Sequence, residues 1–255
     1  MTKTQRTHRN LRIGSLALLC VAWELLARAL SSMFVPSFTD TAAAFLQLVS
    51  TRPFWQAIWI SHQALLLGFG CALILGTLAG LAMGRWRAVE GLCDPYVNLL
   101  LATPISAVIP VIILAVGLGL PARALVVFLF AVAVIAVNTR AGLKTIEPAW
   151  IDMARGFGAT ERQVWRTILI PGALPAMMAG YYLGLGRALT GMIAVELLLV
   201  AVGIGRMILD YQGMFAADLL YATVIFVSGE AVLLLGAVRW LERRITPWND
   251  QVAVE

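Results

Sequence analysis

Long apolar runs separated by short polar stretches make up most of this chain. A helix that crosses a bilayer needs about 20 mostly apolar residues, and six runs approach that length. They cover Leu11–Leu30, Ser61–Gly84, Val97–Leu120, Ala122–Val137, Ala176–Val202 and Leu219–Trp240. No segment has the period-two alternation of a membrane β-barrel. The pattern therefore predicts an all-α fold, a polytopic membrane helix bundle of about six transmembrane helices.

Composition supports the same class. The 255 residues are 60% hydrophobic and 13% charged, whereas soluble domains are about 45–50% apolar and about 25% charged. Basic residues cluster before the first run and after the second, fourth and sixth. They are Lys3, Arg6, Arg9, Arg12, Arg85, Arg87, Arg140, Lys144, Arg155, Arg162, Arg166, Arg239, Arg243 and Arg244. By the positive-inside rule both termini are predicted to be cytoplasmic, so the net charge of +5 indicates topology and not nucleic-acid binding.

The first run allows a second interpretation. Its basic start, its apolar stretch and Ala27-Arg28-Ala29 loosely resemble a signal peptide with a cleavage site, although Arg28 lies inside that site. Five spans would then remain. Glu24 and Arg28 are spaced i, i+4, which predicts a local ion pair. The three cysteines have no metal or disulfide spacing, so they are interpreted as packing residues and no metal site is predicted.

Two further patterns concern packing. Between the first two runs, Phe34–Ile60 contains an amphipathic segment that predicts a helix on the outer surface, capped by Thr39 or Asp40. In the second run, Gly76, Gly80 and Gly84 form a stripe of small residues that lets two helix backbones approach closely. The stripe serves either a contact between subunits or packing within the chain.

The stretch WIDMARGFGATERQVWRTILIP, residues 150–171, is too polar to span a bilayer and too apolar for an ordinary loop. Pro148 suits the first turn of a helix, and three apolar side chains then fall on one helical face. These are Trp150, Ala154 and Phe157. Gly158 can take the left-handed conformation that ends a helix. A first short amphipathic helix is predicted to end there.

A second short helix is predicted to follow. Thr160 and Gln163 fit a capping box at its start. Val164 and Ile168 would share its apolar face, and Pro171 interrupts it. Two helices this short are unstable alone in water, so each apolar face needs a partner. Local physics leaves two partners open: another protein, or the headgroup layer of the membrane.

The same stretch resembles the EAA loop of ABC-importer permeases, whose pattern is E-A-A, three residues, G, nine residues, I-x-L-P. Asp152-Met153-Ala154 stand for E-A-A, Gly158 is the glycine, and Ile168-Leu169-Ile170-Pro171 stand for I-x-L-P, all at the required spacing. Three positions depart from the pattern: Asp152, Met153 and Ile170. Met153 is bulkier than the alanine of the pattern.

The resemblance extends from about Trp55 to Trp248. Pro104 and Pro110 followed by Gly117-Leu118-Gly119 resemble the third span of the family. Gly191 to Glu196 followed by Gly203-Ile204-Gly205 resembles the fifth. The branch that these segments resemble is the nitrate/sulfonate/taurine (NitT/TauT) permeases. The implied fold is that of a type I ABC-importer permease. The implied domains are an N-terminal part, residues 1–54, a permease domain, residues 55–244, with its coupling loop at 147–171, and a C-terminal tail, residues 245–255.

The resemblance implies a division of labour between subunits. The loop sits in a groove of a cytoplasmic ATPase dimer, a substrate-binding protein delivers the solute, and two permease subunits form the pathway in the bacterial inner membrane. The residues implied in ATPase coupling are Asp152, Met153, Ala154, Gly158, Ile168 and Pro171. The implied solute is small and anionic, of the sulfonate, taurine or nitrate kind, and its identity stays open. ATP and Mg would belong to the partner, with no cofactor in this chain.

The residues independently support that division. A Walker A motif needs Gly-Lys before Ser or Thr, but Lys3 follows Thr2 and Lys144 follows Leu143. No catalytic residue is predicted either. His8 and His62 are the only histidines, and neither a zinc-protease motif nor a nucleophile elbow occurs. A stand-alone secondary transporter is the alternative function, but it would need broken helices or coupling residues in both halves.

Arg187, Glu196 and Glu230 are ionisable residues within the last two apolar runs, and they are functional candidates for that reason. Arg187 and Glu196 are nine residues apart, which places them on opposite helix faces and excludes a pair between them. Arg187 either faces an anionic solute such as a sulfonate or lies near the cytoplasmic end, snorkelling or paired. Glu196 resembles a glutamate of the branch and is either structural or in the pathway, and Glu230 is equally unassigned.

Overall fold

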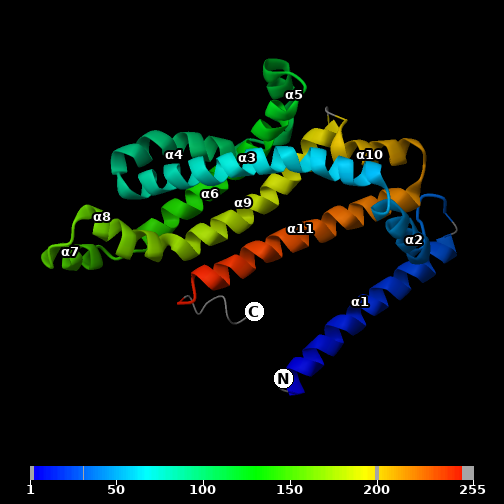
Figure 1. Ribbon diagram of the computed structural model, residues 1–255, viewed down its shortest axis with the longest axis horizontal. Helices are drawn as coiled ribbons and strands as arrows, with labels where there is room; N and C mark the ends of the chain where they lie inside the picture. The colour runs from blue at the N-terminus through cyan, green and yellow to red at the C-terminus, as the bar shows by residue number, and fades with distance from the viewer. Residues whose placement is uncertain (1–2, 31, 199–200, 249–255) are drawn as a thin grey trace.

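The computed structural model describes residues 3–30, 32–198 and 201–248, with α1 side chains given only at residue 11, residues 14–15 and from residue 17 on. Every regular element among these residues is helical, so the all-α prediction is confirmed (Figure 1). The elements are α1 Lys3–Leu30, α2 Phe38–Val49, α3 Arg52–Arg85, α4 Arg87–Ala102, α5 Ile105–Val116, α6 Leu120–Lys144, α7 Pro148–Gly156, α8 Glu161–Val164, the π turn η1 Trp165–Leu169, α9 Ile170–Leu198, α10 Gly203–Gly213 and α11 Ala217–Ile245.

Helices α3, α6 and α9 pack together as the core of the bundle. The glycine stripe of α3 lies against α6: a Cβ added at Gly76 would stand 2.9 Å from the carbonyl oxygen of Val132, and one at Gly80 would stand 2.5 Å from that of Ala136. The backbones therefore approach too closely for any side chain at these positions. The glycine stripe therefore packs α3 against α6 within the chain, which is one of the two roles that the sequence left open.

Four helical stretches among the described residues are long and apolar enough to cross a membrane. They are Arg52–Arg85, Leu120–Lys144, Glu161–Leu198 and Ala217–Ile245. The third predicted run, Val97–Leu120, is not one straight span, because α4 and α5 meet at an angle of 104°. Thr103 precedes Pro104, and a residue before proline is forced towards an extended backbone; its ψ is 128°. The bent pair raises the number of candidate spans to at most five.

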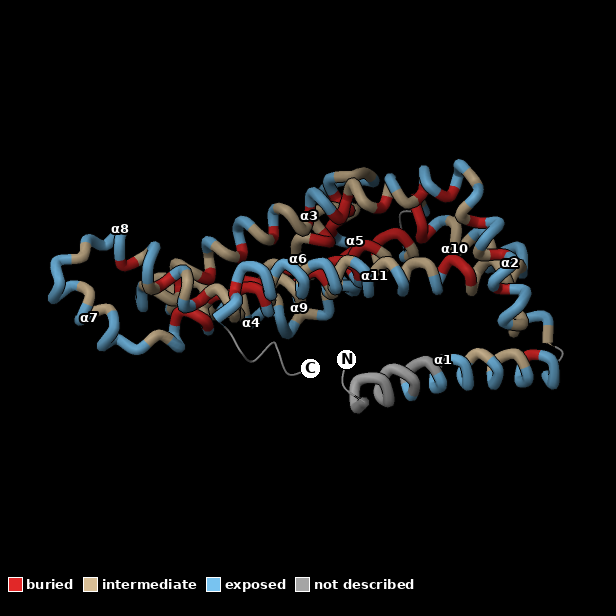
Figure 2. The backbone as a smooth tube through the Cα atoms, turned by 60° about the horizontal axis from the view of Figure 1, so that its bottom comes forward, coloured by how far each residue is buried: buried red, intermediate tan, exposed pale blue. Residues whose placement is uncertain are grey.

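The first predicted run, Leu11–Leu30, lies within α1. This helix leaves the bundle next to α2 and runs apart from it (Figures 1 and 2). Its described leucines, such as Leu18 and Leu19, are exposed. The predicted Glu24–Arg28 ion pair is confirmed at 2.6 Å. Because part of α1 lies outside the described side chains, a sixth span and the signal-peptide alternative stay predictions. Residues 199–200, at the end of the fifth run, and 249–255 of the predicted tail also lie outside the described residues.

The predicted surface helix between the first two runs exists as α2, but its predicted cap was wrong. Ser37 is the N-cap, and its hydroxyl accepts a hydrogen bond from the amide N–H of Asp40 at 3.1 Å. Thr39 and Asp40 already lie inside the first turn. A serine with an extended backbone satisfies a free amide of the first turn, and Ser37 is placed one residue before the helix begins.

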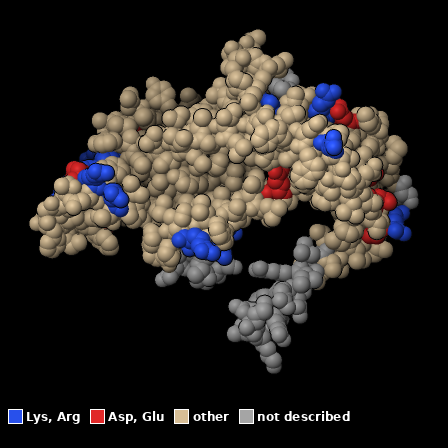
Figure 3. Space-filling view, in the orientation of Figure 1, with Lys and Arg blue, Asp and Glu red and all other residues tan. Residues whose placement is uncertain are grey.

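Charge is concentrated near the ends of the bundle. Lys and Arg side chains gather near α7 and α8 and near the C-terminal end of α11, while the face between them consists mainly of other residues (Figure 3). An apolar band with basic groups beyond it is the surface expected of a protein that lies in a bilayer. The end of the bundle that carries α7 and α8 is called the coupling end below.

Candidate functional site

Helix α7 ends in a turn built around Gly158. The amide N–H of Ala159 donates to the carbonyl oxygen of Ala154 at 3.0 Å. The amide N–H of Gly158 donates to the carbonyl oxygen of Arg155 at 2.9 Å. These are the two hydrogen bonds of a Schellman motif, in which the residue after the C-cap is left-handed. Gly158 has φ +78°, so the conformation predicted for it is confirmed. Its backbone freedom directs the chain from α7 into α8.

The start of α8 is fixed by the predicted capping box. The amide N–H of Thr160 donates to Gln163 Oε1 at 2.7 Å, and the amide N–H of Gln163 donates to Thr160 Oγ1 at 3.4 Å. Glu161, the first residue of α8, accepts hydrogen bonds from Arg155 of α7 and, at 3.3 Å, from Arg85 of α3. The turn between the two short helices is therefore held to the end of α3 by charge.

The apolar face of α7 differs from the predicted one. Ile151 and Ala154 are half-buried and pack against the cluster formed by α6, α8 and α9. Trp150, Met153 and Phe157 point away from the bundle, with exposed fractions of 59%, 58% and 87%. These three follow i, i+3, i+7 and form a second apolar face. The sequence placed Trp150 and Phe157 with Ala154, but packing against the bundle separates them.

The second predicted helix is also different, because it does not end at Pro171. The described backbone continues from α8 through the π turn η1 into α9. In this turn the amide N–H of Ile170 donates to the carbonyl oxygen of Trp165, five residues back. Pro171 has no N–H, and its ring would clash with a carbonyl in a regular α-helix. A widened turn directly before it removes that conflict and lets the helix run on.

The residues of the predicted coupling motif do not form one surface. Asp152 and Met153 are exposed on α7, Ala154 is half-buried, and Gly158 is exposed at the turn. Ile168 and Pro171 are half-buried and line a cavity of about 540 Å³, to which α7 contributes Trp150. The other residues that line it are Thr145, Ile146, Glu147, Thr167, Gly172 and Trp248. The motif thus combines an exposed face on α7 with the hinge that joins α8 to α9.

Glu196 is fully buried at the opposite end of the bundle. Its Oε2 accepts hydrogen bonds from Ser61 Oγ at 2.8 Å and from the amide N–H of Gly205 at 3.0 Å. Ser61 Oγ in turn accepts from the amide N–H of Ile204 at 3.0 Å. Arg123 Nη1 lies 3.5 Å from Glu196 Oε1. The carboxylate therefore fixes the start of α10 onto α3, α6 and α9.

This cluster contains residues that the sequence did not single out. Arg123 belongs to the fourth apolar run and Ser61 begins the second, and neither was expected at a functional site. The glycines near Glu196 gave a signal: a Cβ at Gly203 would stand 2.3 Å from Ser61 Oγ, and one at Gly205 would stand 2.4 Å from Glu196 Cβ. Two glycines that close to a carboxylate indicate tight backbone contact, but the contacting residues are distant in sequence.

Glu230 of α11 has a partner as well. Its Oε1 lies 2.5 Å from His62 Nε2 of α3, and His62 Nδ1 lies 2.8 Å from the carbonyl oxygen of Ile58. Both side chains are largely buried, with exposed fractions of 19% and 15%. The pair joins α11 to α3 in the interior, and the sequence gave no reason to connect these two residues. Arg187, in contrast, is exposed and lines a cavity.

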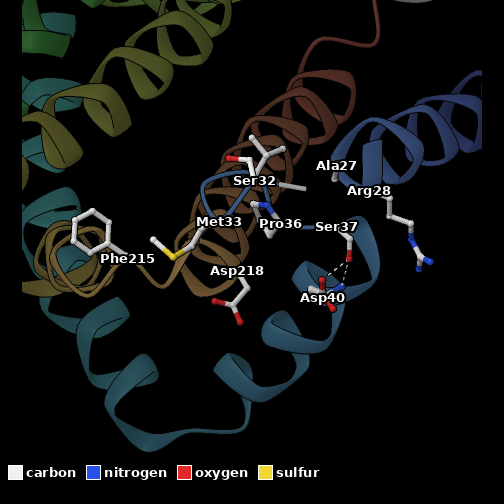
Figure 4. Close-up of a pocket in the computed structure, with 11 residues that line it drawn as sticks. Ala27, Arg28, Ser32, Met33, Pro36, Ser37, Asp40, Phe215 and Asp218 are labelled. Atoms are coloured by element: carbon white, nitrogen blue, oxygen red, sulfur yellow. Dashed lines mark hydrogen bonds between the residues drawn. The ribbon is translucent and has the colours of Figure 1, made fainter. Parts of the chain in front are cut away.

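A further cavity of about 540 Å³ lies at the end of the bundle away from the coupling end (Figure 4). The end of α1, the start of α2 and the turn between α10 and α11 surround it. In the close-up Asp40 lies on α2 and Ser37 directly before it, and Phe215 and Asp218 lie on the α10–α11 side. Phe215 has φ +56°, an uncommon conformation for a residue with a Cβ. The cavity is open and mixed in polarity.

Comparison with known proteins decides the class of this bundle. The sequence profile of the family "Binding-protein-dependent transport system inner membrane component" matches residues 72–247. The chain belongs to this family. It is the permease component of an ABC importer, a multi-pass protein of the inner membrane. The stand-alone secondary transporter, kept as an alternative on the sequence, is thereby set aside.

Curated relatives identify the branch of the family to which the permease is similar. It is 30% identical to the taurine transport system permease protein TauC of Escherichia coli (strain K12). The alignment of 250 residues covers 95% of this chain and 91% of that protein. It is 31% identical to the bicarbonate transport system permease protein CmpB of Synechococcus elongatus. That alignment of 194 residues covers 75% of this chain and 69% of CmpB. The predicted resemblance to NitT/TauT permeases is confirmed.

Solved structures agree on the fold. The permease superposes on a chain of the inward-facing MetNI methionine ABC transporter with a TM-score of 0.57 and 23% identity, over 76% of this chain and 95% of that one. It superposes on a chain of an amino acid ABC transporter with a TM-score of 0.58 and 18% identity, over 80% and 97%. The bundle therefore has the fold of an ABC-importer permease.

Proposed function

We propose that the α7–α8 segment is the docking element through which this permease is coupled to a separate ATPase subunit. The observation that carries this is the exposed apolar face of Trp150, Met153 and Phe157 at the tip of the coupling end. An exposed apolar patch beside charged groups is typical of a protein interaction site. The family supports an ATPase as the partner. ATP and Mg would be bound there, and this chain would carry no cofactor and no hydrolytic residue.

The docking proposal is tested by a matched pair of tryptophan and phenylalanine replacements. The double variant Trp150→Ser, Phe157→Ser is expected to bind the ATPase at least about 30-fold more weakly, because even one central aromatic residue contributes about 2 kcal/mol or more to an interface. The control is Trp59→Ser on α3, which is 60% exposed against 59% for Trp150. The measurement is co-purification of the ATPase from membranes at equal permease levels.

If the double variant retains the ATPase as well as the control does, α7 lies on the membrane surface and not in a protein groove. The same co-purification gives the stoichiometry. Each chain has one α7–α8 segment among its described residues, and an ATPase dimer offers two grooves. We therefore propose two permease subunits per two ATPases, either two copies of this chain or this chain and a close homologue. One permease per two ATPases would contradict this.

For the transported solute we propose a small molecule that carries an oxyanion group. The relatives named for taurine and for bicarbonate transport support this class, and so does the unpaired Arg187 discussed below. A binding protein would deliver the solute and set most of the selectivity. Uptake of labelled taurine and bicarbonate by cells that express the complete importer, compared with cells that lack the permease, tests the class. Transport of neither, with transport of a cation or a neutral sugar instead, would overturn it.

The orientation in the membrane follows from the same proposal, because an ATPase partner requires the coupling end to face the cytoplasm. Reporter domains fused after Gly84 and Arg140 are expected to report the cytoplasmic side, and fusions after Gly119 and Gly205 the other side. The basic groups near α7 and α8 give the physical reason. A reporter that reads outside after Arg140 would place α7 on the wrong side and refute ATPase docking.

A further inference from the structure

The position of Arg187 is unusual for a charged residue. It lines a cavity of about 450 Å³ together with Phe130 and Val134, which stand near the middle of the 25-residue helix α6. It is therefore near the midpoint of the bundle and not at its cytoplasmic end. This position argues against snorkelling of Arg187, because a side chain at that depth is far from the headgroup layer.

Arg187 also differs from the other charged residues of the interior in having no ionic partner. Arg123 is paired with Glu196, and His62 is paired with Glu230. Among the described residues, no salt bridge or side-chain hydrogen bond involves Arg187, whose side chain is exposed. A lone guanidinium in hydrocarbon is costly. It must therefore face water or a negatively charged ligand.

The surroundings of Arg187 suit an anion. Tyr182 and Thr190 of α9 line the same cavity, and the guanidinium carbon of Arg239 lies 4.6 Å from the centre of the Tyr182 ring. A second cation is thus next to the cavity wall. The remaining lining residues are Phe130, Val134, Leu183, Gly186 and Leu235. None of the described residues that line the cavity carries a carboxylate, so this wall neither neutralises the guanidinium nor repels an anion.

The cavity opens on a face of α9 that this chain leaves uncovered. Ala179, Leu183, Arg187 and Thr190 are exposed and recur at helical spacing along that face. A face that carries an unpaired arginine is unsuited to lipid, whereas it can border a water-filled route between two subunits. The opposite faces of α9 are covered by α3, α6, α10 and α11.

We propose that Arg187, in the cavity that Tyr182 and Thr190 also line, forms an anion-binding subsite in the translocation pathway. It is suited to a sulfonate or another small oxyanion, because a guanidinium donates two parallel hydrogen bonds to such a group. The apolar wall accommodates the short carbon chain of an alkanesulfonate. This inference rests on the proposed anion transport, and it assigns the residue that contacts the solute within the membrane.

The test uses a thiol reagent that itself carries a sulfonate. Thr190→Cys is made in a chain whose native cysteines, Cys20, Cys71 and Cys93, are replaced by serine. The complex is labelled in membranes, without nucleotide and with a non-hydrolysable ATP analogue, by sulfonatoethyl or trimethylammonioethyl methanethiosulfonate. The anionic reagent is expected to react about tenfold faster, because a local positive potential concentrates anions. Adding Arg187→Gln should make the reaction rates of the anionic and the cationic reagent similar. Adding Arg187→Lys should preserve the faster reaction of the anionic reagent.

Leu233→Cys on α11, a position that is 75% exposed, is the control for a lipid-facing site and should react with neither reagent. No labelling of the Thr190→Cys variant in either nucleotide state, or an anion preference that survives Arg187→Gln, would overturn the subsite. ATPase co-purification is measured on every variant. If docking persists while the anion preference is absent, the subsite alone is wrong; if docking is lost in the unsubstituted parent, the proposed function is wrong.

Discussion

Replacing Gly158 with valine is expected to abolish productive docking of the ATPase while leaving the membrane bundle intact. Gly158 has φ +78°, and an added Cβ would meet nothing within 4 Å. The penalty is therefore one of backbone conformation, about 1–2 kcal/mol for an ordinary residue and more for a β-branched one. The Schellman turn would open, and α8 would lose its direction relative to α7. Insertion does not depend on this turn, so membrane levels should be normal.

Two variants make this result specific. Gly156→Val changes the last residue of α7, where the added Cβ also meets nothing within 4 Å and φ is not positive; it should have the milder effect. Gly158→Asn should retain most docking, because asparagine tolerates the left-handed conformation. The measurements are ATPase co-purification and solute uptake at matched levels. Normal docking and uptake by Gly158→Val would show that residues 150–171 are not the coupling element.

Removing the Glu196 carboxylate is expected to destabilise the whole bundle. In Glu196→Ala, the buried Arg123 loses its counter-charge, and Ser61 Oγ and the amide of Gly205 lose their acceptor. Breaking a buried ion pair by deleting one partner costs about 3–5 kcal/mol. The unfolding midpoint of the purified permease should fall by roughly 10 °C. Glu196→Gln keeps an acceptor for Ser61 and Gly205, so its loss should be smaller.

The matched control is Asp210→Ala on α10. Asp210 forms an exposed i, i+4 pair with Arg206, in which the side chains are 51% and 63% exposed. Exposed pairs of this kind contribute about 0.5 kcal/mol or less, so the midpoint should hardly change. The measurement is thermal unfolding in detergent followed by loss of monodisperse protein. A Glu196→Ala variant as stable as the Asp210→Ala variant would mean that Glu196 does not hold α10 in place.

Predictions from the sequence were correct where a structural feature depends only on residues that are close together in the chain. The Gly158 turn and the Thr160–Gln163 capping box involve groups within a few residues of each other, and the structure has both. Predictions failed where packing competed with local preference. Pro171 was expected to interrupt a helix, but the π turn at Trp165–Leu169 precedes it and the helix continues into α9. Val97–Leu120 has the hydropathy of one span, yet Thr103-Pro104 bends it sharply.

The sequence by itself determined the class of the protein, the main helices, the Gly158 turn and the Thr160–Gln163 capping box, because hydropathy, capping and turn chemistry are local properties. Only the tertiary structure decided which face of α7 stays exposed, and which interior charges are paired. Glu196 meets Ser61 and Arg123 across 135 and 73 positions of sequence, and His62 meets Glu230 across 168. No periodicity encodes such contacts. They follow from how α3, α6, α9 and α11 pack, and the same packing leaves Arg187 without an ionic partner among the described residues.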